Sequence, residues 1–104
     1  MLTESAGEKL RQLRVQRKLS LREAAAMIDI DIGVLSKMER GERNFTKNVV
    51  KHLANLYKVN VDNLLVHFLS DKILHELQNE ELGIKALKVT EQRMRSKMKN
   101  HGTK

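Results

Sequence analysis

Residues 19–41 read LSLREAAAMIDIDIGVLSKMERG and contain two short amphipathic segments with almost no chain between them. Apolar residues recur at steps of three and four in each segment, which predicts helices over 21–28 and 32–39. Three residues separate the two helices. This connection is too short to lay the helices side by side, so they are expected to cross at a steep angle, as in a helix-turn-helix. We expect Ala25 and Ala26 at the crossing, and Asp29 at positive φ in the turn.

Further helices are predicted from N-cap signals followed by apolar periodicity. Ser5 with Glu8, and Ser20 with Glu23, have the spacing of capping boxes. Asp31, Thr46 and Asn60 are further N-cap candidates. The resulting helices are 6–17, 21–28, 32–39, 47–57 and 61–79. Met27 and Met38 are expected to fill the core.

Composition limits the class of protein. The chain has 104 residues, which fits one domain, with no proline or cysteine and five glycines. The absence of cysteine excludes disulfides and thiolate metal sites, and fits a reducing compartment. We find no apolar run long enough to span a membrane and no signal-peptide pattern, so we expect a soluble, cytoplasmic protein without a membrane partner.

Charge is distributed unevenly along the chain. The net charge of +7 comes from +5 over residues 1–60, −3 over 61–86 and +5 over 87–104. A basic front of this size makes nucleic acid the first partner to test. Solvated helix faces also carry many lysines and arginines, so charge alone does not decide the function.

Three segments give the sequence a family resemblance: GEKLRQLR at residues 7–14, LSLREAA at 19–25 and LSKMERG at 35–41. Residues 7–65 resemble the lambda-repressor, Cro and Xre type of helix-turn-helix domain. The resemblance implies an all-α chain: a five-helix lambda-repressor-like DNA-binding domain over residues 5–66, with an additional C-terminal helical extension. It makes 32–39 the recognition helix, which would enter the major groove of DNA.

The resemblance also implies roles for individual residues. Arg14 and Glu39 match a mostly buried structural salt bridge of the family, so Glu39 is not interpreted as a catalytic acid. Ile32, Gly33 and Lys37 match positions that touch base edges. The remaining DNA-binding candidates match phosphate-contacting positions or lie beside them: Arg22, Ser36, Arg40, Arg43, Asn44 and Lys47.

Two departures from the family pattern concern base contacts. Leu21 stands where family members often have a glutamine that helps to hold DNA. The front of the recognition helix, residues 31–34, has few side chains that hydrogen-bond to bases. Direct readout would therefore depend mainly on Lys37, with DNA shape supplying further selectivity.

The C-terminal part continues the apolar pattern beyond the family domain. Residues 84, 87, 91, 94 and 98 step by three and four after a break at Gly83. We expect residues 67–98 to form a helical extension and 99–104 a disordered basic tail. The hypothesis is that the extension builds a homodimer interface from Phe68, Leu69, Ile73, Leu77, Ile84 and Leu87; the alternative is an extra core helix of a monomer.

Other kinds of site find little support. His67, Asp71 and His75 share a helix face, but ligands at i, i+4 and i+8 span about 12 Å, too far to hold one ion. No nucleophile elbow or phosphate-binding glycine loop occurs, so no enzyme, metal, cofactor or small-molecule substrate is expected.

The interpretation is a sequence-specific transcriptional regulator that binds double-stranded DNA as a homodimer on a two-fold-related operator. A repressor or autoregulator controlled by its own concentration is expected. The alternative is a protein-interaction module, such as an antitoxin or an antagonist of another regulator, that uses its C-terminal helices. Phage-type repressors, restriction–modification controllers and antitoxins all fit the resemblance.

Overall fold

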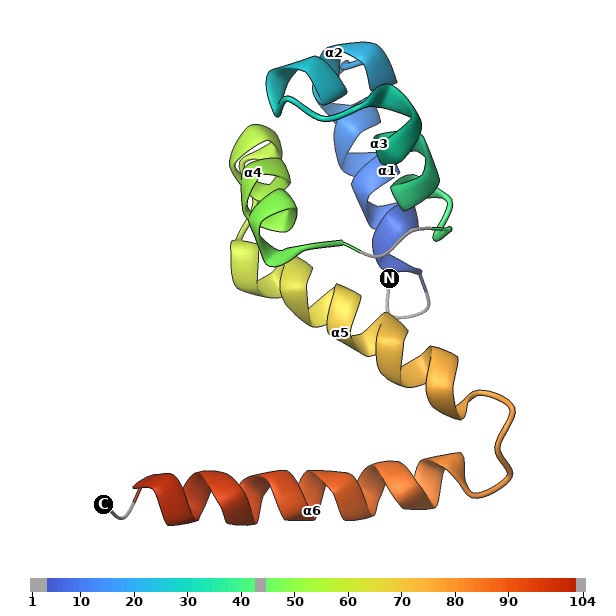
Figure 1. Ribbon diagram of the computed structural model, residues 1–104, viewed down its shortest axis with the longest axis vertical. Helices are drawn as coiled ribbons and strands as arrows, with labels where there is room; N and C mark the ends of the chain where they lie inside the picture. The colour runs from blue at the N-terminus through green and yellow to red at the C-terminus, as the bar shows by residue number, and fades with distance from the viewer. Residues whose placement is uncertain (1–3, 43–44, 103–104) are drawn as a thin grey trace. The chain divides into compact units, whose positions relative to one another are not determined.

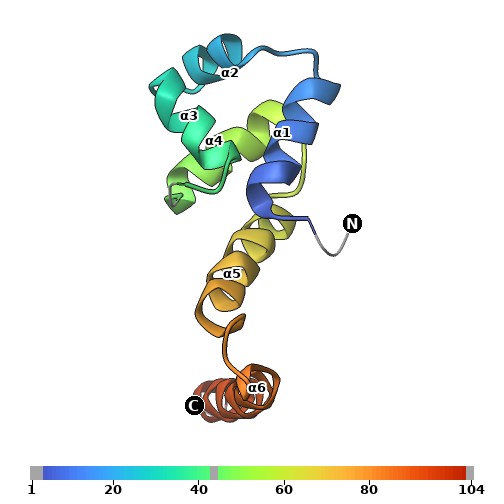
Figure 2. The same ribbon diagram turned by 90° about the vertical axis from the view of Figure 1, so that its right-hand side faces the viewer.

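The computed structural model describes residues 4–42 and 45–102, and within these ranges the chain is all-α, with no strand. Figures 1 and 2 show α1 to α4 gathered together, with the first turns of α5 following α4. The five expected helices form with ends within two residues of the prediction, and a sixth begins at the expected break. In chain order they are α1 (Ala6–Gln16), α2 (Leu21–Met27), α3 (Ile32–Glu39), α4 (Lys47–Tyr57), α5 (Val61–Leu77) and α6 (Gly83–Gly102).

The helices begin at the predicted caps. Ser20 and Glu23 form a complete capping box: the Glu23 N–H donates to Ser20 Oγ at 3.0 Å, and the Ser20 N–H donates to Glu23 Oε1 at 2.9 Å. At the start of α1, the Ser5 side chain accepts from the Glu8 N–H, which is one half of the predicted box. The other predicted caps also accept from backbone amides: Asp31, Thr46 and Asn60.

Four helices end on a residue in the left-handed region, which explains how a chain without proline stops them. The φ angles are 58° at Lys18, 57° at Asp29, 75° at Gly41 and 55° at Lys58. Each end has the two backbone hydrogen bonds of a Schellman motif; after α2, for example, the Ile30 N–H donates to Ala25 O and the Asp29 N–H to Ala26 O. The expectation for Asp29 is confirmed.

The core is formed by one apolar stripe from each of the first five helices. Its largest fully buried side chains are Tyr57, Leu10, Leu35, Leu53, Leu64 and Val50. Burying a side chain of leucine size stabilises the fold by roughly 1.5–3 kcal/mol. Helix α3 contacts both α1 and α2, and so its inner face is fixed by two neighbours.

Two expectations about the core are wrong. Ala24 and Ala25 are the buried alanines of α2, whereas Ala26 is exposed. Met27 is 62% exposed, while Met38 is buried as predicted. The reason is the same in both cases: the buried side of α2 follows steps of three and four through residues 21, 24, 25 and 28, and residues 26 and 27 lie on the other side of the helix.

The chain divides into two compact units, one ending at Lys72 and the other beginning at Ile73. The first part of α5 therefore belongs to the same compact unit as α1 to α4. A long-range bond shows this directly: the Ala6 N–H at the start of α1 donates to Asp71 Oδ2 at 2.9 Å. Asp71 therefore caps α1 together with Ser5.

In the second unit, α6 begins at a tight junction. Gly83 is buried, and a Cβ at this position would lie 2.7 Å from the backbone oxygen of Leu77. Helix α6 continues to Gly102. Residues 84–101 contain no glycine or proline, so the sequence offers no interruption before Gly102. No helix in the described part of the chain is long and apolar enough to cross a membrane.

Candidate nucleic-acid interface

Helix α3 has one buried face and one open face. Leu35, Met38 and Glu39 are buried against α1 and α2. On the open side, Ile32, Lys37 and Arg40 are exposed. A helix held in this way can offer its outer face to the major groove without losing any of its core contacts.

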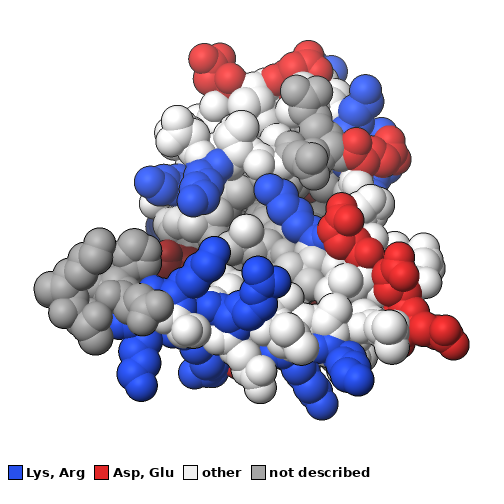
Figure 3. Space-filling model, turned by 60° about the horizontal axis from the view of Figure 1, so that its bottom comes forward, with Lys and Arg blue, Asp and Glu red and all other residues white. Residues whose placement is uncertain are grey.

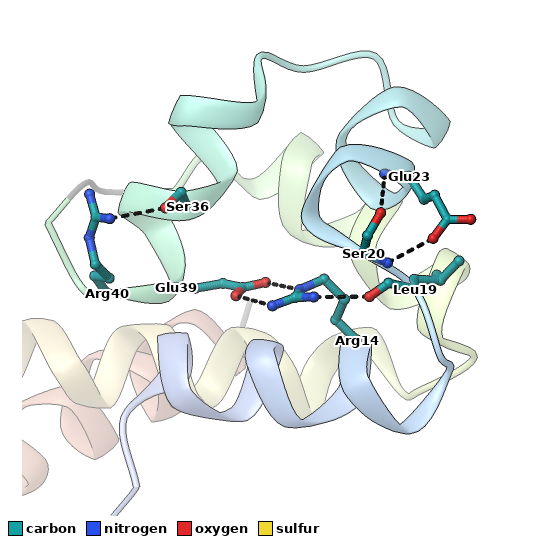
Figure 4. A network of polar contacts seen from close by, with 7 residues as sticks. All are labelled: Arg14, Leu19, Ser20, Glu23, Ser36, Glu39 and Arg40. Atoms are coloured by element: carbon teal, nitrogen blue, oxygen red, sulfur yellow. Dashed lines mark hydrogen bonds and ion pairs between the residues drawn. The ribbon is translucent and has the colours of Figure 1, made fainter.

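Arg14 of α1 binds the buried face of α3 through Glu39 (Figure 4). Its guanidinium donates from Nε to Glu39 Oε2 at 2.8 Å and from Nη2 to Glu39 Oε1 at 3.1 Å, while Nη1 donates to Leu19 O at 2.9 Å. Arg14 and Glu39 are 9% and 8% exposed. One side chain thus fixes α1, the segment before α2 and the end of α3 in one arrangement.

The guanidinium of Arg14 carries a secure positive charge. The hydrogen bond to Glu39, supported by the charge of that carboxylate and opposed by burial, raises the pKa of Arg14 above its ordinary value. A bidentate arginine–carboxylate pair is more specific in its geometry than a lysine contact. The pair therefore serves as a rigid anchor for α3.

The front of α3 is shaped by its N-cap. Asp31 Oδ2 accepts from the Gly33 N–H at 2.8 Å and from the Val34 N–H at 3.3 Å. A Cβ at Gly33 would lie 2.9 Å from that same carboxylate oxygen. The glycine thus leaves room for the capping carboxylate, and next to it Ile32 presents an apolar side chain outward.

The end of α3 carries a polar cluster formed by Ser36, Arg40 and Glu42, and the sequence did not predict a part for Glu42. Arg40 Nη1 donates to Ser36 Oγ at 3.1 Å, as Figure 4 shows, and its Nε donates to Glu42 Oε2 at 2.9 Å. Ser36 and Arg40 were expected as phosphate-contacting residues; Glu42 was not considered. The sequence feature that indicates this ion pair is an acidic residue two positions after Arg40, beyond the end of the helix.

The remaining DNA-binding candidates lie on different elements. Lys47 is the first residue of α4 and Arg22 lies in the first turn of α2, and both are exposed. Arg43 and Asn44 lie outside the described residues. The N-terminus of α4 adds partial positive charge close to Lys47, a combination that suits a phosphate.

The six residues of the expected dimer interface have different surroundings. Phe68 packs on Phe45 with ring centroids 4.0 Å apart, beside the core. Leu77 is half-buried, and the other four are exposed: Leu69, Ile73, Ile84 and Leu87. Val66, Met94 and Met98 are also exposed.

No group of three or more potential metal ligands occurs among the described residues. Asp71, which shares a helix face with His67 and His75, has a structural partner in the Ala6 N–H.

Comparisons with known proteins agree with this geometry. A helix-turn-helix family model matches residues 10–64. The chain is 37% identical over 67 residues to the HTH-type transcriptional regulator DdrOP3 of Deinococcus deserti, an alignment that covers 62% of this chain and 52% of that protein. The chain therefore spans about half the length of this curated relative. It is also similar to the crystal structure of the clp gene regulator ClgR from Corynebacterium glutamicum, with a TM-score of 0.57, 25% identity, and coverage of 77% of this chain and 85% of that one.

Proposed function

The chain belongs to the helix-turn-helix family of transcriptional regulators, and from this membership we propose that it binds operator DNA in a sequence-specific way, as a homodimer, with α3 as the recognition helix. The observation that carries the proposal is that α3 has one buried, anchored face and one exposed face. Its inner face is fixed by the buried Arg14–Glu39 pair, while Ile32 and Lys37 are exposed on its outer face.

The proposed contacts fall into two classes. Ile32, Gly33 and Lys37 face base edges in the major groove, where Ile32 suits the methyl group of thymine and Lys37 suits the acceptors of guanine. The phosphate contacts are assigned to side chains around the ends of α2, α3 and α4, which fix the position of the protein on the duplex. These are Arg22, Ser36, Arg40, Arg43, Asn44 and Lys47.

A homodimer would place two copies of α3 about one helical turn of DNA apart, so the operator would be an inverted repeat. Exposed apolar side chains on α5 and α6 support this part of the proposal, because single domains rarely leave many such side chains in contact with water. A repressor that controls its own gene is the simplest regulator of this kind. It requires neither catalysis nor a cofactor, and a cytoplasmic location is part of the proposal.

A duplex is first selected from random double-stranded DNA by repeated rounds of binding to the full chain. The experiment then compares Lys37→Ala with Arg40→Ala in the full chain, using fluorescence anisotropy on this selected duplex and on a scrambled duplex over a range of salt concentrations. We expect Lys37→Ala to lower the preference for the selected duplex by about 10-fold or more. Arg40→Ala should weaken binding to both duplexes alike and reduce the slope of log Kd against log salt by about one.

Lys72→Ala is the control, because it removes the same charge from an exposed position on α5. A Lys37→Ala protein that keeps its full preference for the selected duplex would contradict the assignment of α3 as the reading element.

A second candidate function is supported by the same exposed apolar side chains. Leu69, Leu74 and Leu82 are all open to solvent, as expected for a module that docks a different protein. In that case Lys37→Ala would preserve the biological effect and Leu69→Glu would abolish it.

A further inference from the structure

Helix α5 carries an apolar stripe on the side opposite to the core. Val66, Leu69 and Ile73 step by three and four residues and are 45–63% exposed, and the half-buried Leu77 continues the stripe. The core-facing side of the same helix is formed by Leu64 and its neighbours. Two apolar stripes on one helix mean that α5 is built to pack on two sides.

Helix α6 carries a second stripe and buries none of it. Ile84, Leu87, Met94 and Met98 lie at heptad-like steps and are 38–70% exposed. Every described side chain of α6 after Gly83 is exposed. A helix of 20 residues without a packed face gains little stability from its own propensity, so a partner for this stripe is expected.

The charges beside the two stripes are opposite in sign. Acidic residues outnumber basic ones beside the α5 stripe and in the turn that follows it: Asp62, Glu76, Glu80 and Glu81 against the single exposed Lys72. Basic residues follow the α6 stripe one position further along: Lys85, Lys88, Arg95 and Lys99. Figure 3 shows lysine and arginine side chains gathered along α6. The interspersed Glu91 is bound by Arg95 at 2.9 Å, so the net character of this face is basic.

We propose that α6 of one copy docks on the outer stripe of α5 of a second copy, and that the second copy returns the same contact. This inference rests on the proposed homodimer and specifies its surfaces. The charges indicate which helix docks on the α5 stripe. Pairing α6 with α6, or α5 with α5, would bring like charges together, whereas pairing α5 with α6 brings opposite charges together. Two reciprocal contacts form an isologous, closed dimer.

The first test is the mass of the full chain by sedimentation velocity over a range of concentrations. Leu87→Glu with Met94→Glu should raise the dimer Kd by at least 10-fold, because both charges enter the apolar stripe. Val89→Glu is the matched control: it adds a charge to the other side of α6, at a similarly exposed position, and should leave the dimer Kd within about 2-fold.

The second test uses charge reversal in two full-length proteins, one with Lys88→Glu and Arg95→Glu, the other with Glu76→Lys and Glu80→Lys. In the proposed arrangement each protein alone opposes like charges at both contacts, so each should be largely monomeric at concentrations where the unmodified chain dimerises. An equimolar mixture should form a heterodimer, because every α6 then meets an α5 of opposite charge. The rescue itself shows that both proteins are folded.

The outcomes are distinct. A mixture that stays monomeric, or two reversed proteins that remain dimeric on their own, overturns the α5–α6 docking and leaves the proposed homodimer to other surfaces. An unmodified chain that is monomeric at all concentrations overturns the homodimer as well. Docking of another protein would leave the chain monomeric until that partner is added, which also contradicts the inference.

Discussion

The backbone of Gly7 in α1 lies directly against the carbonyl oxygen of Glu39 at the end of α3. A Cβ at Gly7 would lie 2.6 Å from Met38 O and closer still to Glu39 O. Both atoms belong to the backbone, so neither can move aside as a flexible side chain does. The close contact brings α1 near enough to α3 for Arg14, about two turns further along α1, to reach Glu39. Glycine permits this contact because it has no Cβ.

Gly7→Ala should therefore destabilise the protein by about 1–3 kcal/mol through overpacking. The sign of the stability change is informative, because at an open helix position glycine-to-alanine substitution stabilises a protein by about 1 kcal/mol. The measurement is urea denaturation followed by circular dichroism, with Gln12→Ala at an exposed position of α1 as the control. A Gly7→Ala protein as stable as the unmodified chain would show that α1 and α3 are not in close contact here.

Arg14→Met should cost about 3–5 kcal/mol, because it leaves the Glu39 carboxylate buried without a partner. Combining it with Glu39→Met should recover most of the loss, since an apolar pair of similar size carries no uncompensated charge. Thermal and urea denaturation of both proteins measure the difference. If the double variant were no more stable than Arg14→Met alone, the cost would come from lost packing rather than from the buried charge.

Tyr57 gives a pH dependence with a defined sign. Burial, with a contribution from the charge of Glu39, raises the pKa of Tyr57 to about 12. Below pH 10 the phenol is neutral in both the folded and the unfolded state; between about pH 10 and 12 only the unfolded state ionises. Stability should fall over that window by roughly 2–3 kcal/mol.

Tyr57→Phe is the control for this window, because it removes the titrating group while keeping the ring. At neutral pH it should be neutral or stabilising, since among the described residues the buried Tyr57 hydroxyl has no hydrogen-bond partner. Identical loss of stability above pH 10 in both proteins would show that Tyr57 is not the cause of the pH dependence.

Glu42 competes with the proposed phosphate contact of Arg40. Both side chains are more than half exposed, and the carboxylate holds the guanidinium at 2.9 Å. Glu42→Gln should raise the affinity for duplex DNA several-fold at low salt, with a smaller gain at high salt. Glu8→Gln, which removes an exposed charge from α1, should change affinity much less. Equal effects of the two changes would remove Arg40 from the proposed interface.

Local patterns in the sequence were enough to predict most of the helical framework. N-caps act within three residues, and the short connection between α2 and α3 forces positive φ at Asp29, so both features could be predicted from neighbouring residues alone. The Arg14–Glu39 pair was expected only through the family resemblance, because nothing local relates residues 25 positions apart.

The contacts that the sequence did not predict depend on tertiary structure. Asp71 caps α1 across 65 residues of chain, and Phe45 pairs with Phe68 across two helices; no spacing rule relates either pair. Met27 illustrates the opposite case: methionine commonly fills cores, which suggested burial, but no neighbouring helix covers that side of α2 within the described residues. Side chains that close a fold at long range are determined by packing geometry, which single-sequence periodicity does not contain.

The central claim, that α3 reads a two-fold-related operator, is tested most directly by selecting ligands for the full chain from random duplex DNA over several rounds at two salt concentrations. The account predicts enrichment of one inverted repeat whose half-sites are about one helical turn apart, with binding that weakens steeply as salt is raised. Salt-sensitive binding without any enriched sequence would contradict it, because the basic surface would then bind DNA while α3 reads no bases.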